Sequence, residues 1–180
     1  MKKESFGHKL LRVMGMTMDE APEEEAAPGV QLVAPLSGTI VAIENVKDDA
    51  FNSLAMGNGC AIDPEVGEVY APCDGVISVV PDTLHAVGIT ANNGADILIH
   101  VGMDTVGLKG KGFEMLVKED QPVKQGDLLL KFDIPTIKAA GLPVVTPVVV
   151  NNSDEYPNFK IIPAEGTTVK TGDKLIEASK

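Results

Sequence analysis

The sequence predicts an all-β fold, a distorted and barrel-like antiparallel β-sandwich with a duplicated hairpin motif and one or two short helices. From Val30 onward, short β-branched runs alternate with Gly, Pro, Asn and Asp, a pattern typical of sandwiches and barrels. Two turn motifs each occur twice within apolar stretches, which indicates related hairpins. Aromatic residues make up only 4% of the 180 residues, so aliphatic side chains must form the core.

The expected strands are short and follow one another closely. They cover residues 31–33, 38–42, 60–63, 68–70, 75–80, 86–90, 96–101, 113–116, 128–132, 144–149 and 174–177. Helix is scarce. Asp133, Pro135 and Gly141 are the residue types preferred at helix starts and ends, so they predict one short helix. A second short turn is expected at 50–55.

Two motifs recur with the same internal spacing. Ala-Pro-x-x-Gly-x-Ile begins at Ala34 and again at Ala71, and Val-Lys-x-Gly-Asp-x-Leu begins at Val123 and again at Val169. Each predicts a β-turn, because Pro sets one φ angle or Gly supplies a conformation that other residues avoid. The chain is therefore expected to be built from related hairpins.

The distribution of charge divides the chain into three parts. Residues 1–18 carry four basic residues and one acidic residue, 19–29 carry five acidic residues and no basic one, and 30–180 hold 11 basic and 20 acidic residues. The acidic stretch is poor in apolar residues and contains proline, which is typical of a disordered linker. Residues 30–180 are expected to form the folded domain.

The first 18 residues have two interpretations. Their large apolar side chains are spaced four apart, at Phe6, Leu10, Met14 and Met18. An amphipathic helix with this spacing lies on an anionic membrane surface. A frayed terminus without a role is the alternative, because the two glycines of this segment weaken a helix.

Composition excludes several classes of function. The net charge of -11 argues against capture of DNA or RNA phosphates and favours a basic protein partner. Cys60 and Cys73 form no C-x-x-C motif, so they are expected to be reduced, packed thiols. No apolar run approaches the roughly 20 residues of a membrane-spanning helix. With no secretory signal, the protein is expected to be cytoplasmic.

Two of the three histidines are candidates for a common site. If residues 96–102 form a strand, Leu98 and His100 point to one face, and the β-branched neighbours point to the other. Thr83 and His85 would share a face with Val87, provided that their strand begins before His85. A lone histidine is usually a hydrogen-bonded structural side chain, but two together beside Gly102 favour a reactive site, since imidazole titrates near neutrality.

The motifs around these histidines resemble a known family. They include the segment from Leu32 to Gly38, the Tyr70 to Gly75 segment, Thr83-Leu-His85-Ala, and the long run from Ile97 through Asp104 to Phe113. Over residues 31–177 the chain resembles the glucose-class enzyme IIA components of the bacterial phosphoenolpyruvate-dependent sugar phosphotransferase system.

The resemblance implies a phosphocarrier and no cofactor. In this family the carrier protein HPr phosphorylates a histidine, here His100, and the phosphoryl group passes to a cysteine of an enzyme IIB domain or IICB sugar permease. A neutral imidazole attacks through the nitrogen without hydrogen, so a carbonyl must hold the proton on the other nitrogen. The resemblance makes Gly102 the candidate. It makes His85 the donor to the phosphoryl group, oriented by Thr83.

The resemblance also implies a partner-binding rim. Asp104 and, through a loop, Asp48 match carboxylates that can pair with an arginine of HPr. An exposed apolar ring for docking is expected around them. Its members would be Phe51, Val87, Leu98 and Val101.

Alternative functions remain open at this stage. Zinc endopeptidases of the lysostaphin type combine His-x-x-x-Asp with His-x-His, and this chain has only the first, at His100 and Asp104. His85 and His100 could still bind zinc if a partner supplied a ligand. A swinging-arm carrier would need a lysine at a hairpin tip, and a nucleotide-dependent kinase would need a complete phosphate-binding loop.

The resemblance allows two organisations of the chain, a free-standing component and a domain of a fused transporter. It also allows regulatory targets, whose binding would depend on the phosphorylation state.

Overall fold

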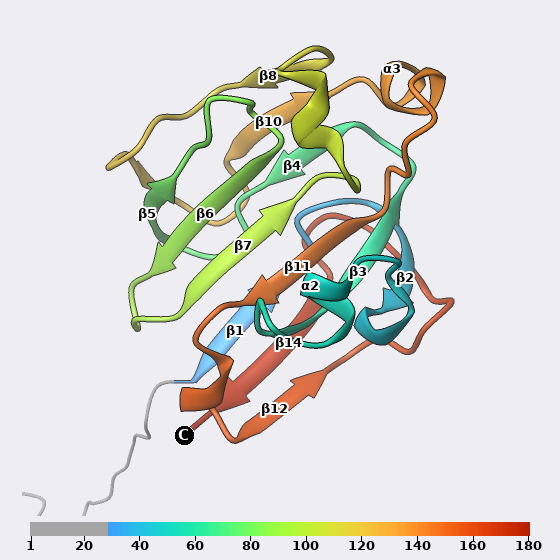
Figure 1. Ribbon diagram of the computed structural model, residues 1–180. Coiled ribbons are helices and arrows are strands. Elements are labelled where there is room, and N and C mark those ends of the chain that lie inside the picture. Colours follow the sequence, from blue (N-terminus) through green and yellow to red (C-terminus); the bar gives the residue numbers. More distant parts are fainter. Residues whose placement is uncertain (1–28) are drawn as a thin grey trace, which may run out of the picture.

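The computed structural model describes residues 29–180, and these form an all-β domain (Figure 1). The interpretations given for residues 1–18 and for the acidic residues before Gly29 lie outside the described residues. In the described part, no helix is long and apolar enough to cross a membrane.

The strands form one large and two small antiparallel sheets. The large sheet has the order β13-β2-β3-β11-β7-β6-β5-β9, and the small sheets have the orders β1-β14-β12 and β4-β10-β8. The strand bounds are β1 Val30–Val33, β2 Gly38–Ala42, β3 Asn58–Pro64, β4 Glu68–Tyr70, β5 Gly75–Val79, β6 Ala86–Ala91, β7 Asp96–His100, β8 Phe113–Met115, β9 Pro122–Val123, β10 Leu128–Phe132, β11 Thr146–Val150, β12 Asn158–Ile161, β13 Thr168–Val169 and β14 Lys174–Ser179.

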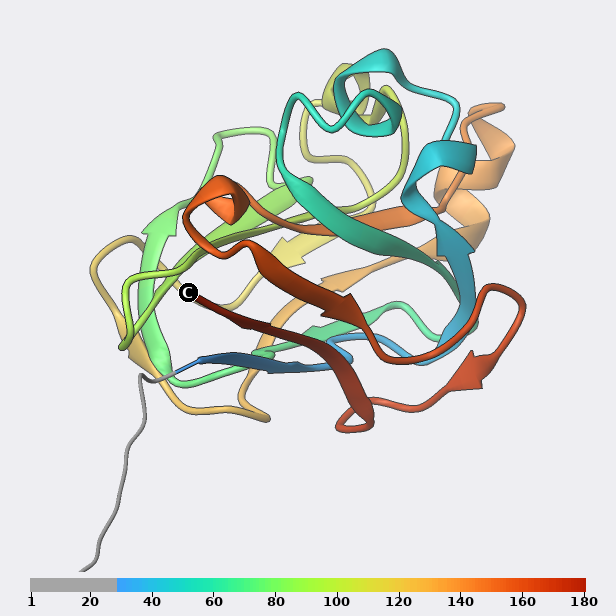
Figure 2. The ribbon, with the colours of Figure 1, turned by 90° about the horizontal axis from the view of Figure 1, so that it is seen from below.

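The helices are short. Their bounds are η2 Ile43–Asn45, α2 Asp49–Asn52, η3 Thr105–Leu108, α3 Ile134–Ala139 and η4 Ser153–Glu155. The helix predicted from Asp133 is confirmed as α3, and the Asp133 side chain accepts a hydrogen bond from the Thr136 amide at 3.1 Å. Figure 2 shows α2 and η3 gathered on the same side of the molecule, away from the C-terminus.

The main core lies between the large sheet and the small sheets, since its buried side chains come from all three. A second, smaller cluster covers the opposite face of the large sheet. It contains Phe51 of α2 together with Ala61 and Val149, whose strand neighbours Ile62 and Val148 belong to the main core. The large sheet is therefore buried on both faces where η2 and α2 cover it.

The duplicated turns predicted from sequence are confirmed. The Lys124 amide donates to Asp127 Oδ2 at 2.9 Å, and the Lys170 amide donates to Asp173 Oδ2 at 2.8 Å. The glycine of each turn has a positive φ, 94° at 126 and 98° at 172. A swinging-arm carrier would need its lysine at the tip of a hairpin. Lys124 and Lys170 instead come directly before the residues that form the bends, 125–126 and 171–172.

The two copies of the proline motif exchange equivalent hydrogen bonds. The Val33 amide donates to Pro72 O at 3.0 Å, and the Tyr70 amide donates to Pro35 O at 2.8 Å. The internal repeat therefore relates two halves of the domain by an approximate two-fold arrangement.

Some strands were not predicted. These are β9, β12 and β13, of which β9 and β13 have two residues each. The two-residue strands β9 and β13 contain too few residues for an alternating pattern. The predicted strand 144–149 begins later, at Thr146, and contains Pro147 as its second residue, although the strand pairs on both sides.

Pro147 is tolerated in β11 because the hydrogen-bonded pairing between β11 and β7 ends at the neighbouring residue, so the missing N–H of proline breaks no bond between these strands. The β11–β7 register stops at Val148 opposite Ile99. The Asn151 amide donates toward β7, to Asp96 O at 2.7 Å. Alternation directs the missing N–H of Pro147 to the same side, opposite His100.

Gly75→Ala is expected to lower the free energy of unfolding by about 1–3 kcal/mol, the usual cost of overpacking. A Cβ at this position would lie 2.3 Å from the Thr90 carbonyl oxygen. Urea denaturation measures the effect. Gly107→Ala is the matched control, since its Cβ would meet no atom within 4 Å. Equal stability of the two variants would contradict this account of the close strand approach.

Candidate functional site

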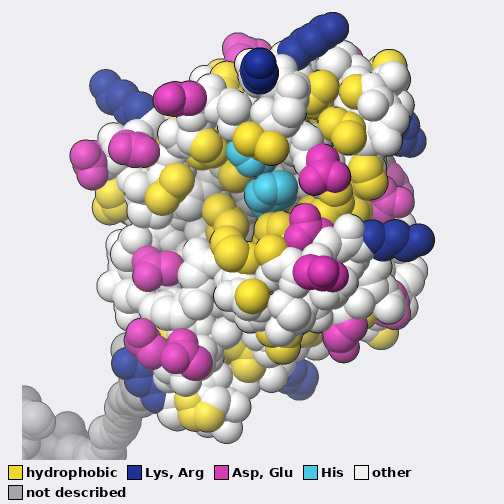
Figure 3. All heavy atoms as spheres, in the orientation of Figure 1, with side chains coloured by type: hydrophobic (Ala, Val, Ile, Leu, Met, Phe, Trp, Pro, Cys, Tyr) yellow, Lys and Arg dark blue, Asp and Glu magenta, His cyan; other side chains and the backbone are white. Residues whose placement is uncertain are grey.

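His100 is the last residue of β7 and lies on the face that alternation predicted. Ile97, Ile99 and Val101 are buried in the main core, whereas Leu98 packs against the second cluster. His100 therefore points out of the main core, toward the side that carries α2 and η3. In Figure 3 the histidine side chains form a patch with apolar and acidic side chains around it.

One hydrogen bond defines the protonation of His100. Its Nδ1 lies 2.9 Å from the Gly102 carbonyl oxygen. A carbonyl only accepts, so Nδ1 carries the hydrogen and Nε2 keeps its lone pair. Gly102 is needed at this position, since its φ is +75° and an added Cβ would lie 2.6 Å from Thr105 Cγ2.

The second histidine lies beside the first. The His85 and His100 ring centroids are 4.8 Å apart in an edge-to-face arrangement. Thr83 Oγ1 lies 2.7 Å from His85 Nδ1, so the two predicted partners are in contact. This leaves Nε2 of His85 as the ring nitrogen without a side-chain partner in the described part of the chain.

The face predicted for Thr83, His85 and Val87 is wrong. β6 begins only at Ala86, and Leu84 has a φ of +61°. This left-handed residue turns the backbone before the strand, so simple alternation does not apply. Val87 is buried opposite Ile99 in the main core instead.

Burial keeps both imidazoles neutral. Burial and, to a smaller extent, the proximity of His100 together lower the pKa of His85 to about 4. Burial also lowers the pKa of His100, against the effects of the Gly102 carbonyl, Asp48 and Asp104, which raise it. A neutral His100 with a free Nε2 lone pair is a nucleophile.

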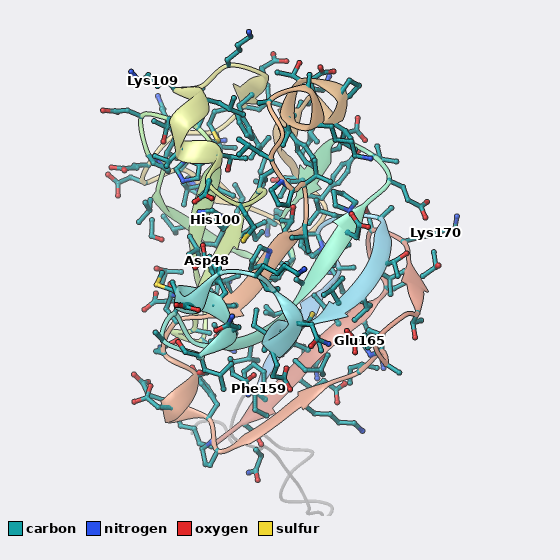
Figure 4. All side chains as sticks on the ribbon, turned by 45° about the vertical axis from the view of Figure 1, so that its right-hand side comes forward. Asp48, His100, Lys109, Phe159, Glu165 and Lys170 are labelled. Atoms are coloured by element: carbon teal, nitrogen blue, oxygen red, sulfur yellow. The ribbon has the colours of Figure 1, made fainter. Side chains whose placement is uncertain are left out.

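The two predicted carboxylates lie near His100 and act on its charge. Asp48 caps α2, and its Oδ1 accepts from the Ala50 amide at 2.9 Å. Asp104 precedes η3 with a φ of +59° and is exposed. Figure 4 shows Asp48 close to His100. Both residues therefore stand at the starts of short helices at the edge of the site, and α2 holds the Asp48 carboxylate by a hydrogen bond.

The predicted exposed apolar ring is wrong for most of its members. Val87 and Val101 are fully buried, and Phe51 is only 3% exposed. Val87 and Val101 face the main core because strand pairing directs them there, whereas Phe51 of α2 packs into the second cluster. Leu98 alone is partly exposed. Phe51 instead packs its ring on His100, with centroids 5.1 Å apart.

Other apolar residues are exposed next to the site residues. Val106 of η3 is 53% exposed and follows Asp104 by two positions, and Leu54 is 44% exposed just after α2. Neither residue was predicted to be part of the site. Each is an apolar residue in a short helical segment or turn, where strand alternation carries no information about exposure.

The remaining candidate chemistry is absent from the described part of the chain. Cys60 and Cys73 are buried free thiols, and burial raises their pKa values to about 12 and about 11. In residues 29–180, no group of three His, Cys, Asp or Glu side chains is placed to hold a metal ion. The zinc-peptidase alternative therefore lacks its ligand set there.

Comparison with known proteins assigns the family. A family model described as the phosphoenolpyruvate-dependent sugar phosphotransferase system, EIIA 1, matches residues 30–156. The chain belongs to this family. A solved glucose permease IIA from Mycoplasma capricolum is similar to this EIIA chain, with a TM-score of 0.76 and 32% identity, and the match covers 84% of this chain and 96% of that one.

Relatives of this EIIA chain differ in length. A glucose-specific EIIA component of Halalkalibacterium halodurans is 46% identical, over 89% of this chain and 92% of that protein. A β-glucoside-specific EIIBCA component of the same organism is 38% identical over 92% of this chain. The match covers only 27% of that EIIBCA protein, so the chain spans about a quarter of its length.

An NMR titration of the imidazole protons is expected to find both site histidines, His85 and His100, neutral at pH 7, with the pKa of His85 near 4. Because this folded pKa lies below the ordinary value of 6.5, the unfolded chain binds more protons in between. The free energy of unfolding should therefore fall as the pH drops through this interval. His85→Gln should lack this part of the pH dependence. A His85 pKa at or above 6.5 would contradict the assignment.

Proposed function

We propose that this EIIA chain is a phosphocarrier of the sugar phosphotransferase system. It accepts a phosphoryl group from phospho-HPr on His100 Nε2 and passes it to a cysteine of an enzyme IIB domain, which phosphorylates the incoming sugar. The observation that carries the proposal is the bond between His100 Nδ1 and the Gly102 carbonyl, which leaves Nε2 as the nucleophile. Membership of the EIIA 1 family supports the same chemistry.

The acceptor step is a direct exchange between two imidazoles. The lone pair of His100 Nε2 forms a bond to phosphorus, and the bond between phosphorus and the donor's ring nitrogen breaks. The departing imidazole of HPr takes the electron pair of that bond. Positive charge develops on the His100 ring, where the Gly102 carbonyl, Asp48 and Asp104 favour it. No separate base is required.

His85 stabilises the phosphoryl group. The Thr83 hydroxyl donates to His85 Nδ1, so that His85 Nε2 carries a hydrogen and donates it to a phosphoryl oxygen. The 2.7 Å contact between Thr83 and His85 and the proximity of the two rings support this role. A dianion next to His85 also raises the pKa of its imidazole by Coulomb attraction, which strengthens the donor.

Asp48 and Asp104 recognise the phosphoryl donor. Their carboxylates would repel a phosphoryl group, so their position at the rim suits pairing with a cationic side chain of HPr during docking. Leu98, Val106 and Leu54 supply partly or largely exposed apolar surface near these carboxylates. The glucose-specific and β-glucoside-specific relatives support a sugar permease as the second partner.

Incubation of the purified chain with phosphoenolpyruvate, enzyme I and HPr is expected to add one acid-labile phosphoryl group to His100. Intact mass spectrometry before and after acid treatment measures it. His100→Ala should remain unmodified, and His85→Ala is the matched control because it keeps the acceptor. An unmodified wild-type chain would refute the proposal.

His85→Gln is expected to accept phosphate from HPr at nearly the normal rate. Its onward transfer to an enzyme IIB domain should fall by about 10²-fold, the typical effect of removing one preorganised donor. Rapid-quench measurement of each half-reaction separates the two. Thr83→Ala should weaken the same step to a smaller extent. Normal onward transfer by His85→Gln would exclude the donor role.

A further inference from the structure

We propose that Glu119 and Glu165 are a pair of positioning residues, each of which anchors one of the two loops that flank His100. This inference rests on the proposed phosphocarrier function. Neither glutamate contacts His100; in Figure 4 the labelled Glu165 and His100 lie well apart, with Asp48 nearer to His100. Each glutamate accepts a hydrogen bond from a backbone amide at the end of a strand, and through this bond it positions the loop that follows.

Glu165 anchors the loop that follows β2. Its Oε2 accepts from the Ala42 amide at 3.1 Å and from Asn45 Nδ2 at 2.7 Å. Ala42 is the last residue of β2, and Asn45 is the last residue of η2. The carboxylate therefore joins a loop more than a hundred residues away to the start of the segment that carries Asp48 and Phe51. These bonds also lower the pKa of Glu165.

Glu119 makes the corresponding contact after β5. Its Oε2 accepts from the Val80 amide at 3.2 Å. Val80 directly follows β5 and begins the turn that carries Thr83 and His85. The two glutamates thus cap the two strands that lead into the site.

The internal repeat makes these contacts equivalent. The Ile40 amide donates to Thr167 O at 2.9 Å, and the Ile77 amide donates to Gln121 O at 2.9 Å. The residue after each glutamate closes the same turn: Gly166 N donates to Ile40 O at 2.9 Å, and Asp120 N donates to Ile77 O at 2.8 Å.

Backbone conformation and sequence extend the equivalence. Asp120 and Gly166 have φ values of +71° and +87°. In both copies of the duplicated turn motif, a glutamate lies four residues before the valine, at Glu119 and at Glu165. The repeated motif is therefore Glu-x-x-x-Val-Lys-x-Gly-Asp-x-Leu. The recurrence of a glutamate on the strand end in both halves argues against a fortuitous surface contact.

The two anchored loops supply different parts of the reaction. The loop held by Glu165 carries the rim carboxylate Asp48 and the Phe51 ring that packs on His100. The turn held by Glu119 carries the Thr83–His85 pair. Loosening the first should weaken recognition of the phosphoryl donor, and loosening the second should weaken stabilisation of the phosphoryl group.

The test is a comparison of Glu165→Ala with Glu119→Ala in both half-reactions. Glu165→Ala is expected to raise the KM for phospho-HPr about three- to tenfold with kcat nearly unchanged. Glu119→Ala is expected to lower kcat for onward transfer by a similar factor with KM nearly unchanged. These factors correspond to the loss of one or two hydrogen bonds at an exposed position.

Conservative variants and a matched surface variant complete the design. Glu165→Gln and Glu119→Gln keep an acceptor oxygen and should restore wild-type kinetics. Glu65→Ala removes an exposed glutamate for which the described part of the chain shows only a backbone bond, from its amide to Ser37 O. It should leave all kinetic constants unchanged.

A readout without phosphate distinguishes the possible failures. Hydrogen exchange should show faster exchange of the Ala42 amide in Glu165→Ala only and of the Val80 amide in Glu119→Ala only. If the wild-type protein is not phosphorylated by HPr but the variants show these exchange changes, the phosphocarrier function is refuted and the two glutamates still anchor their loops. Normal exchange at both amides, or the same kinetic effect from both variants, would refute the paired positioning role.

Discussion

The hydrogen bond from His100 Nδ1 to the Gly102 carbonyl carries the chemistry of this site, and much of the surrounding structure serves to place that carbonyl. The backbone reaches it through a positive φ at Gly102, where the Pro143 carbonyl oxygen would lie 2.8 Å from any added Cβ. The same Pro143 oxygen accepts from the Met103 amide at 3.1 Å, so the loop before β11 holds the turn in place. A small rotation of this turn would free Nδ1 and allow the hydrogen to move to Nε2, which would remove the nucleophile.

Burial and charge act on the site in opposite directions. Desolvation lowers the pKa of both histidines, which keeps them neutral. The nearby carboxylates of Asp48 and Asp104 oppose this effect at His100, so they would favour positive charge on the ring in the proposed phosphoryl transfer. The excess of acidic residues in the whole chain, with a net charge of -11, adds a field that would favour a basic partner over an acidic one. Burial thus keeps the His100 ring neutral and nucleophilic, while the carboxylates around it suit the binding of a cationic partner.

The internal repeat explains how one site draws on both halves of the domain. β2 and β5 begin at the equivalent glycines Gly38 and Gly75. When the residue pairs are followed from these glycines into the neighbouring strands, Val149 occupies the position equivalent to His100, and Asn58 the position equivalent to His85. Only one half therefore carries the histidines. The other half contributes the longer connection between β2 and β3, with η2 and α2, which covers the second face of the sheet and brings Phe51 to His100. The two connections are therefore equivalent in position but differ in length and in the side chains that they bring to the site.

The sequence by itself determined the all-β class, most strand positions, the repeated turns, the helix after Asp133 and the pair of histidines, because these depend on local periodicity and on residues with restricted φ angles. Only the tertiary structure decided which side chains are exposed. Val87 and Val101 were predicted at the surface but are buried by strand pairing, whereas Val106 and Leu54 were missed since they lie in short helical segments or turns. The placement of His85 also needed the structure, because the left-handed residue Leu84 breaks the alternation. Burial, sheet register and contacts between Glu165 and Asn45 arise from residues far apart in the chain, and local patterns contain no record of them.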